Sequence, residues 1–199
     1  MILLIAAMES EMKEIILQPH PQIKMVQTGV GKVNASSVLS RELTKESFDL
    51  ILNLGLAGAT KPFTPGDFVL IKDATYHDFD LTMFGYQKGQ VPGYPAKFQS
   101  NQLWMNKIEK EVKGLKIGSL YTGDCFMTKG FHDHMVFDME GAALYQVAYA
   151  YQVPIVSLKV ISDIVGSKEH IQNYTHFESQ QGALKLLEIY QRLVEGVIT

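Results

Sequence analysis

Residues 48–58 read FDLILNLGLAG, an apolar run that ends in the small residues Gly55, Ala57 and Gly58. A run this apolar on both of its faces is typical of a strand buried between helices in a parallel sheet. The stretches 2–7 (ILLIAA) and 153–163 (VPIVSLKVISD) have the same character. The pattern therefore predicts buried strands at all three places, and with them an α/β protein.

Strand and helix patterns alternate along the rest of the chain. Further strands are expected at 23–29, 66–78 and 116–124. Helices are expected at 10–17, 31–47, 103–114, 139–152 and 178–196. Residues 81–98 are rich in glycine and proline and are expected to form a loop. We therefore predict a three-layer α/β/α sandwich around a central, mostly parallel mixed sheet, in a single domain spanning residues 1–199.

Composition and charge exclude several classes of protein. The 199 residues are 46% hydrophobic and 20% charged, with a net charge of −3, so no basic field is available to bind nucleic acid. No apolar stretch reaches the ~20 residues of a membrane span, and the apolar N-terminal run lacks the leading positive charge of a signal peptide. The only cysteine, Cys125, is expected in the core of a cytoplasmic protein without internal disulfides.

Motifs for cofactors and metals are incomplete. The run GVGKV resembles part of a phosphate-binding loop, but Val26 stands where that loop needs glycine and Val33 where it needs serine or threonine. Asn34 occupies the third glycine position of the dinucleotide-binding fingerprint. His132 and His134 lack the further ligand spacing of a metal site. We therefore expect neither a cofactor nor a metal.

Acidic residues gather at the predicted ends of strands. In open α/β sheets, ligands bind outside the carboxyl ends of the strands. Four of the six predicted strand ends carry an acid, and the six are 8–11, 29–32, 55–58, 76–80, 123–127 and 162–163. This arrangement suits a site that uses carboxyl groups for general acid–base chemistry.

Several motifs along the chain occur together in one known family. They are AMESEM at 7–12, GVGKVNA at 29–35, YHDFDLTMFGYQKGQVPGYPAKF at 76–98, GDCFM at 123–127, DMEGAA at 138–143 and VISD at 160–163. With them the chain resembles, over nearly its whole length, the 5'-methylthioadenosine/S-adenosylhomocysteine nucleosidases, which have the nucleoside phosphorylase fold. The resemblance implies an enzyme that hydrolyses the N-glycosidic bond of these nucleosides and releases adenine.

The resemblance assigns the two catalytic roles to acids. Adenine leaves readily only when a ring nitrogen is protonated, and a water molecule must be activated across the ribose. Asp163 matches the family's acid, with Ser162 orienting it, and burial would let it hold a proton near neutral pH. Glu11 matches the water-activating base, whereas Glu9 is expected to be a solvated helix-start charge. Taken alone, Asp163 could equally cap a following helix, and Glu11 could complement a helix dipole.

The resemblance also implies how the nucleoside binds. Met139 and Glu140 match ribose contacts, with the Glu140 carboxylate accepting both hydroxyl groups. Phe126 matches the side chain that stacks on adenine, and Met127 matches the residue whose backbone reads its edge. Without the resemblance, Glu140 is an ordinary acid of a first helical turn and Phe126 a core residue. The pocket for the 5'-alkylthio group is matched by Met8, Val30, Phe84, Tyr86 and Pro92, with Tyr174 or Phe177 as a cap.

The same resemblance implies the partners of the protein. In the family, the Phe–Gly–Tyr…Pro loop reaches across a dimer interface. We therefore expect a homodimer whose active sites are completed by the partner subunit, and a small adenine nucleoside as substrate. Neither a nucleic acid nor a membrane partner is expected.

The chain departs from the family's usual residues at a few places. Lys159 stands where an arginine is usual, and it can still donate to the water or the ribose but lacks the planar fork of a guanidinium group. Leu56 stands where a serine is usual. The stretch 129–136 is shorter than usual, so a peripheral helix is expected to be trimmed. These departures leave the preferred substrate open.

Three other functions stay open. A phosphorolytic relative needs a cationic cradle for phosphate, and neither Arg41 nor Arg192 lies at a predicted strand end. A nucleosidase acting on futalosine-type compounds would fit the departures at Leu56 and Lys159. A non-catalytic nucleoside-binding protein would have no need of the two matched catalytic acids.

Overall fold

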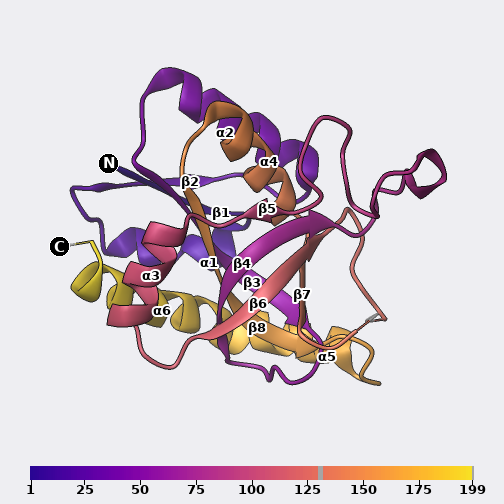
Figure 1. Ribbon diagram of the computed structural model, residues 1–199. Helices are drawn as coiled ribbons and strands as arrows, with labels where there is room; N and C mark the ends of the chain where they lie inside the picture. The colour runs from indigo at the N-terminus through magenta and orange to yellow at the C-terminus, as the bar shows by residue number, and fades with distance from the viewer. Residues whose placement is uncertain (130–131, 199) are drawn as a thin grey trace.

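The computed structural model describes residues 1–129 and 132–198, and within them eight strands form one mixed sheet (Figure 1). The strands are β1 (Ile2–Ala6), β2 (Ile23–Gln27), β3 (Leu50–Ala59), β4 (Phe68–Tyr76), β5 (Phe98–Gln99), β6 (Lys116–Thr122), β7 (Met135–Asp138) and β8 (Ile155–Ile164). Neighbours follow the order β2-β1-β3-β7-β6-β4-β5, and β8 pairs with both β3 and β4. The α/β class predicted from the sequence is confirmed.

Some of these strands close on themselves. β3 pairs with β8, β8 with β4, β4 with β6, β6 with β7, and β7 returns to β3. Within this ring the pairs β4–β8 and β3–β7 are antiparallel and the others are parallel. β1 and β2 extend the sheet from β3 by parallel pairing, and β5 adds a short antiparallel edge to β4. The sheet is therefore mixed and mostly parallel, as predicted, with a barrel-like closure that was not predicted.

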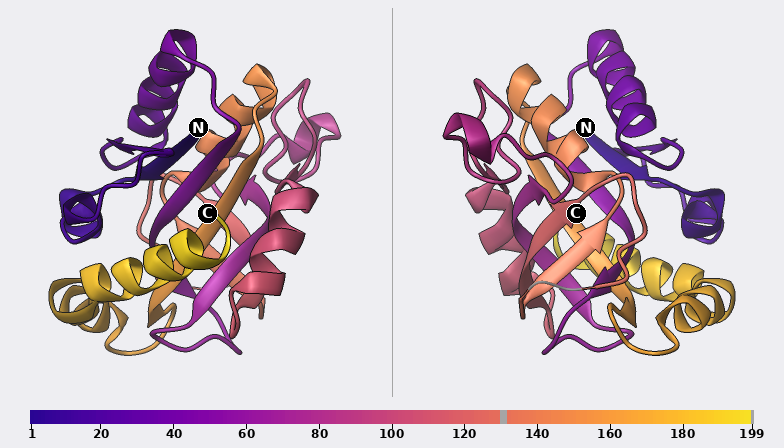
Figure 2. Two further views of the ribbon diagram at one scale, coloured as in Figure 1. Left: turned by 90° about the vertical axis from the view of Figure 1, so that its left-hand side faces the viewer. Right: turned by 90° about the vertical axis from the view of Figure 1, so that its right-hand side faces the viewer.

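Helices cover both faces of the sheet, as Figure 2 shows. α2 (Lys32–Lys45) and α4 (Gly141–Tyr151) share one core with the sheet, whereas α3 (Gln102–Glu111) and α6 (Ala183–Gly196) share the other. β1 divides between them, because Leu3 and Ile5 belong to the first core and Leu4 and Ala6 to the second. Successive side chains of a strand point to opposite faces, so a strand covered on both sides must be apolar throughout.

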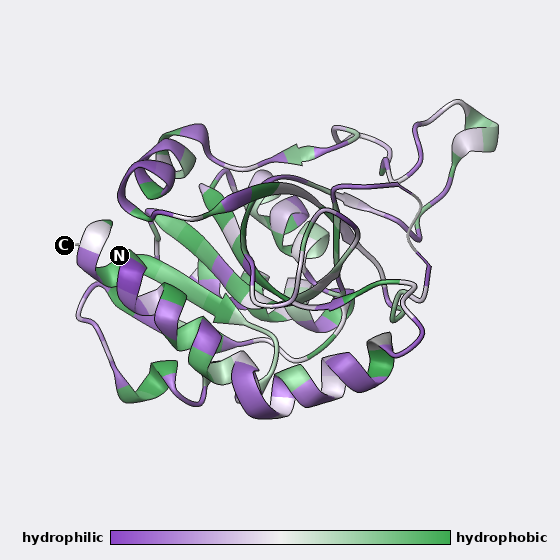
Figure 3. Cartoon of the chain, turned by 90° about the horizontal axis from the view of Figure 1, so that it is seen from below, coloured by the Kyte–Doolittle hydropathy of each residue, from purple (hydrophilic) through white to green (hydrophobic). Residues whose placement is uncertain are grey.

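Hydropathy follows this layering. Figure 3 shows apolar residues concentrated along the central strands, whereas the helices carry both apolar and polar residues. In α6 the residues Leu186, Ile189, Tyr190 and Leu193 are buried, which is the spacing of one helical face. In the part of the chain that the structure describes, no helix is both long and apolar enough to cross a membrane.

Several short elements differ from the sequence prediction. α5 (His170–Phe177) was not predicted, and the closing helix expected at 178–196 begins with a π-helix, η3 (Glu178–Gly182). β7 was also missed, because four residues are too few to show a pattern. The predicted helix at 10–17 is α1 (Glu9–Met12) followed by a 3₁₀ turn, η1 (Ile15–Leu17). Residues 130 and 131 of the stretch expected to be trimmed lie outside the described residues.

The segment between β4 and β5 projects from the sheet, as predicted for a loop (Figure 1). It contains a 3₁₀ turn, η2 (Thr82–Phe84), but is otherwise irregular. Met83 is 85% exposed and Phe84 is 69% exposed. The segment therefore displays large apolar side chains outside either core.

Candidate active site

A pocket lies where the carboxyl ends of β1, β3, β7 and β8 meet, and the loop after β6 forms one of its sides. It encloses about 620 Å³ of space between the atoms, including solvent at its open mouth. Five of the six predicted strand ends contribute to its wall, and the one at 76–80 does not. The wall carries four acids among mostly apolar neighbours, namely Glu11, Asp138, Glu140 and Asp163.

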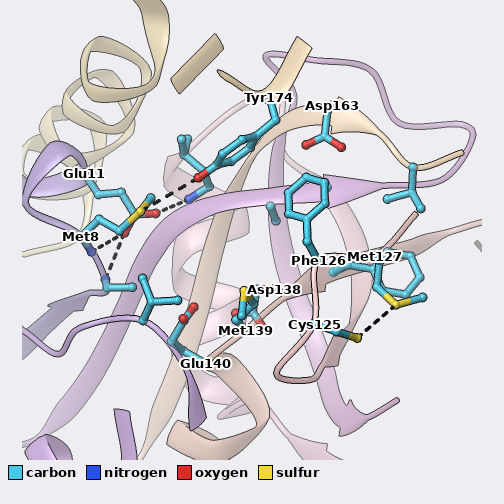
Figure 4. A pocket seen from close by; sticks show the side chains of 17 residues that line it. Met8, Glu11, Cys125, Phe126, Met127, Asp138, Met139, Glu140, Asp163 and Tyr174 are labelled. Carbon is cyan, nitrogen blue, oxygen red and sulfur yellow. Dashed lines mark hydrogen bonds between the residues drawn. The ribbon is translucent and has the colours of Figure 1, made fainter. Parts of the chain in front are cut away.

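Glu11 is held at the start of α1 by backbone donors. It is 4% exposed, and its Oε2 accepts hydrogen bonds from the N–H groups of Ala7 and Met8, both at 3.0 Å (Figure 4). Its Oε1 accepts a hydrogen bond from the N–H of Leu56 at 2.7 Å. Burial raises the pKa of Glu11, and the charge of Lys159 together with the three N–H donors opposes this rise. The carboxyl group is therefore fixed in orientation and remains able to take up a proton.

Asp163 reaches the pocket through an irregularity in β8. The pairing of β3 with β8 shifts between Ala57 and Gly58, and Gly58 pairs with Asp163, which leaves Ser162 as the extra residue of a β-bulge. Ser162 Oγ donates a hydrogen bond to Asp163 Oδ1 at 2.7 Å. A Cβ on Gly58 would stand 3.2 Å from Asp163 Oδ2, so glycine leaves room for the acid. Figure 4 shows Asp163 across the pocket from Glu11.

Glu140 is another acid of the wall and stands just before α4. It is 8% exposed, and its Oε1 accepts a hydrogen bond from the N–H of Gly31 at 2.7 Å. Burial, with the nearby charge of Asp138, raises the pKa of Glu140 to about 7. Met139 and Val30 line the same pocket. A carboxyl group that titrates near neutrality can either accept from or donate to a hydroxyl group.

Phe126 and Tyr174 form an aromatic side of the pocket. Their ring centroids lie 5.4 Å apart in an edge-to-face arrangement. The Tyr174 hydroxyl group lies 4.0 Å from Met8 Sδ, so α5 spans the space between β1 and the loop after β6 (Figure 4). Of the two candidate caps, Tyr174 lines the pocket, whereas Phe177 is 5% exposed and belongs to the core beneath.

The prediction that Cys125 is a core residue was wrong. Its side chain is exposed and lines the pocket beside Phe126 and Met127, with Sγ 4.0 Å from Met127 Sδ. All three residues lie in the loop after β6, which has no buried face to receive a thiol. Cysteine is commonly buried in cores, but this position lies in a loop rather than on a strand or helix that packs against the core.

Lys159 and Ser162 lie behind the pocket wall rather than on it. Lys159 is 3% exposed, and its Nζ lies 2.9 Å from Asp138 Oδ2. Ser162 is 1% exposed. Both residues therefore lie beside wall acids.

Phe84, Tyr86 and Pro92 lie away from the pocket of their own chain. They belong to the projecting segment between β4 and β5, and all three are exposed. This placement is the one that the expected dimer requires, since these side chains would have to line the pocket of a partner. The dimer itself stays a prediction.

Some residues of the wall were not predicted. Asp138 begins the motif DMEGAA and lines the pocket, and its position just before a predicted helix is the only sign of this in the sequence. Phe137 and Val165 are ordinary apolar residues, which only β7 and the bulged end of β8 bring to the pocket. Among residues 1–129 and 132–198, no group of three or more His, Cys, Asp or Glu side chains could hold a metal ion.

The chain is similar to a larger class of proteins over most of its length. Residues 14–198 match the sequence model of the phosphorylase superfamily. The 5'-methylthioadenosine/S-adenosylhomocysteine nucleosidase of Staphylococcus aureus is 33% identical over 164 residues, which cover 75% of this chain and 72% of that protein. The chain belongs to the family of 5'-methylthioadenosine/S-adenosylhomocysteine nucleosidases, as its motifs predict.

Solved structures of the same family have the same fold. The nucleosidase of Colwellia psychrerythraea, in complex with adenine, superposes with a TM-score of 0.86 at 26% identity, covering 98% of this chain and 95% of that one. The S-adenosylhomocysteine nucleosidase of Streptococcus pyogenes, in complex with 5-methylthiotubericidin, gives a TM-score of 0.85 at 25% identity, covering 98% and 96%. The predicted nucleoside phosphorylase fold is thereby confirmed.

Proposed function

We propose that this protein hydrolyses the N-glycosidic bond of 5'-methylthioadenosine and S-adenosylhomocysteine, releasing adenine and the 5'-thioribose product. The observation that carries the proposal is the placement of Glu11 and Asp163 on opposite sides of one pocket, each fixed by its own hydrogen-bond partners. Hydrolysis with inversion needs an acid at the leaving group and a base at the water on the opposite side of the sugar.

Asp163 is the proposed acid at the base end of the pocket. It gives its proton to a ring nitrogen of adenine, and the pair of electrons of the breaking C–N bond passes to the ring. Two observations support this role. The side chain is 1% exposed, which keeps it away from bulk water, and the hydrogen bond from Ser162 fixes the orientation of its carboxyl group. Phe126 stacks on the adenine ring, and the backbone of Met127 contacts its edge.

Glu11 is the proposed base at the ribose end. It takes one proton from water as the water oxygen bonds to the anomeric carbon. Adenine therefore leaves with the proton from Asp163, and the sugar keeps the hydroxyl group of the water. The N–H donors on both oxygens of Glu11 fix the direction from which it receives this proton. Glu140 and Met139 hold the ribose hydroxyl groups.

The 5'-alkylthio group is proposed to lie against the apolar side chains of Met8, Val30 and Tyr174. Phe84, Tyr86 and Pro92 of a second subunit complete this wall in a cytoplasmic homodimer of single-domain chains. The exposure of these apolar side chains on the projecting segment supports the arrangement.

Water rather than phosphate is the proposed nucleophile. A phosphate anion needs several cations around it. Lys159 is paired with Asp138, whereas Arg41 lies on α2 beside Glu42 and Arg192 lies on α6. None of these cations lines the pocket, and Glu11 would repel an anion.

An assay of base release tests this function. Purified protein is incubated with methylthioadenosine, adenosylhomocysteine, deoxyadenosine and a futalosine-type nucleoside, each with and without phosphate. We expect adenine from the first two at a rate independent of phosphate. A requirement for phosphate would identify a phosphorylase, release only from the futalosine-type compound would identify that nucleosidase, and binding without release would identify a binding protein.

A further inference from the structure

Asp138 is a buried acid that the proposed reaction leaves without a role. It ends β7, is 8% exposed, and its Oδ2 lies 2.9 Å from Lys159 Nζ. Its Oδ1 accepts a hydrogen bond from Thr122 Oγ1 at 2.5 Å, and the N–H of Gly141 lies within 3.1 Å of both oxygens. Both carboxylate oxygens are therefore engaged by the protein itself, although the residue stands in the pocket wall.

Lys159 extends from this ion pair toward the proposed base. A Cβ on Gly55 would stand 3.2 Å from Lys159 Nζ and 2.9 Å from Glu11 Oε1, so both atoms flank the same point of β3. The ammonium charge acts on Glu11 and on Glu140 as well as on Asp138. One buried cation thus faces three acids that come from different elements of the fold.

We propose that Asp138 is a positioning residue, which fixes the Lys159 ammonium group so that its charge is shared between Glu11 and Glu140. This inference rests on the proposed function, because it assigns those two acids to water activation and ribose binding. A lysine needs such an anchor more than an arginine does, since its compact charge sits on a flexible stem and lacks a planar fork.

The anchor has a chemical consequence for the base. Without the negative charge of Asp138, the ammonium group is free to pair directly with Glu11 or Glu140, which stabilises their ionised forms and lowers their pKa values. A base with a lower pKa removes a proton from water less effectively, so the rate of the chemical step falls. The groups that face this network are Glu11 from α1, His77 after β4, Asp138 and Glu140 at either end of the turn into α4, Lys159 and Asp163 from β8, and Tyr174 from α5.

A simpler role for Asp138 is to support the turn into α4 through Gly141 and Thr122. The variant Asp138→Asn separates the two roles, because the amide keeps an oxygen for these donors and loses the charge. Thr122→Val is the matched control, since it leaves the ion pair intact but removes two hydrogen bonds of the turn, the one that Thr122 Oγ1 donates to Asp138 Oδ1 and the one that it accepts from the N–H of Ala142.

The test combines kinetics with pH dependence on methylthioadenosine. For Asp138→Asn we expect kcat to fall about tenfold, as when an outer-shell partner of a site is removed, with KM within about threefold of wild type. The acid limb of its pH–rate profile moves to lower pH. Thr122→Val keeps the wild-type profile and kcat. Equal losses in the two variants, or an Asp138→Asn variant with wild-type kcat and profile, would overturn the proposal.

A double-mutant cycle and a conservative variant add independent outcomes. In a Lys159→Gln background, Asp138→Asn is expected to cost less than about threefold, because the group through which Asp138 acts is already gone. An undiminished loss there contradicts the proposal. If Asp138→Asn is too unstable for kinetics, Asp138→Glu takes its place. This variant is expected to have a lower kcat, with the acid limb of its pH–rate profile unchanged. A wild-type kcat would contradict the proposal that Asp138 positions Lys159.

One readout does not depend on activity. Carbon-13 NMR of glutamate carboxyl groups, with the Glu140 signal identified from Glu140→Gln, follows the titration of that residue in the protein without substrate. We expect Asp138→Asn to move this titration to lower pH, and to move it less in a Lys159→Gln background, where only the direct effect of the Asp138 charge on Glu140 is lost. If wild type releases no adenine, the proposed function fails while this titration still decides whether Asp138 controls the network, and an unmoved titration would reject it.

Discussion

Replacing Glu140 by glutamine should stabilise the protein above neutral pH. Burial and the charge of Asp138 raise the pKa of Glu140 from 4.5 to about 7 in the folded protein. Between these values the native state holds a proton that the unfolded chain has lost. The stabilisation from this proton is fully present below about pH 4.5 and is lost as the pH rises to about 7.

The size of the effect follows from the gap between about 7 and 4.5. Each pKa unit corresponds to about 1.4 kcal/mol, so ionised Glu140 lowers the free energy of unfolding by about 3 kcal/mol at pH 8. Glutamine is neutral at every pH, and its Oε1 can still accept from the N–H of Gly31. Glu140→Gln should therefore match wild type near pH 4.5 and exceed its stability by up to about 3 kcal/mol at pH 8.

Urea unfolding at several pH values between 4.5 and 8 measures this difference. Trp104, the single tryptophan, packs against the core from α3 and reports unfolding by its fluorescence. Glu9→Gln is the matched control, because Glu9 is exposed in the first turn of α1. A stability difference that is the same at every pH, or a variant less stable than wild type at pH 8, would refute the reasoning. Catalysis should fall in the same variant, since the ribose loses a charged acceptor.

Four further changes test the site. Asp163→Asn should abolish adenine release while calorimetry still detects binding of a substrate analogue, and full activity would defeat its role as the acid. Glu11→Gln should slow release at least ~10²-fold, and a near-normal rate would place the base elsewhere. Gly55→Ala should lower kcat, because its Cβ would stand 2.9 Å from Glu11 Oε1 and 3.2 Å from Lys159 Nζ; an unchanged rate would show that both groups can shift without loss. Cys125→Ala should change the free energy of unfolding by less than about 0.5 kcal/mol, since the thiol is exposed. A larger loss, measured by urea unfolding, would indicate that the thiol is buried.

The main strands and helices were predictable because their patterns are local. β3 and β8 are apolar on both faces, and this requires a covered sheet wherever the chain later places them. β7 was not predictable because it has only four residues. The closure of the ring was not predictable for a different reason, since it depends on which distant strands pair, and no single stretch of the sequence determines that pairing.

The site was predictable only in part. Strand ends can be located from the sequence, and they do converge, so the acids could be gathered into one list. What separates Glu11 from Glu9 is only partly local. The carboxylate of Glu11 accepts hydrogen bonds from the nearby N–H groups of Ala7 and Met8 and from the distant N–H of Leu56 in β3, whereas the side chain of Glu9 has no such donor among the described residues and is exposed. The ion pair of Lys159 with Asp138 was also not predictable, because Asp138 belongs to β7, the short strand that the sequence pattern does not show.

The ring of paired strands also limits how this chain can change in length. A strand at an open edge can gain or lose a residue and slide past a single neighbour, but each strand of the ring pairs with at least two others. The bulge at Ser162 is one extra residue inside that ring, and removing it would turn Asp163 to the opposite face. Natural insertions and deletions should therefore collect in the segment 77–97 and around β2, while the count of residues from the start of β8 to Asp163 stays constant.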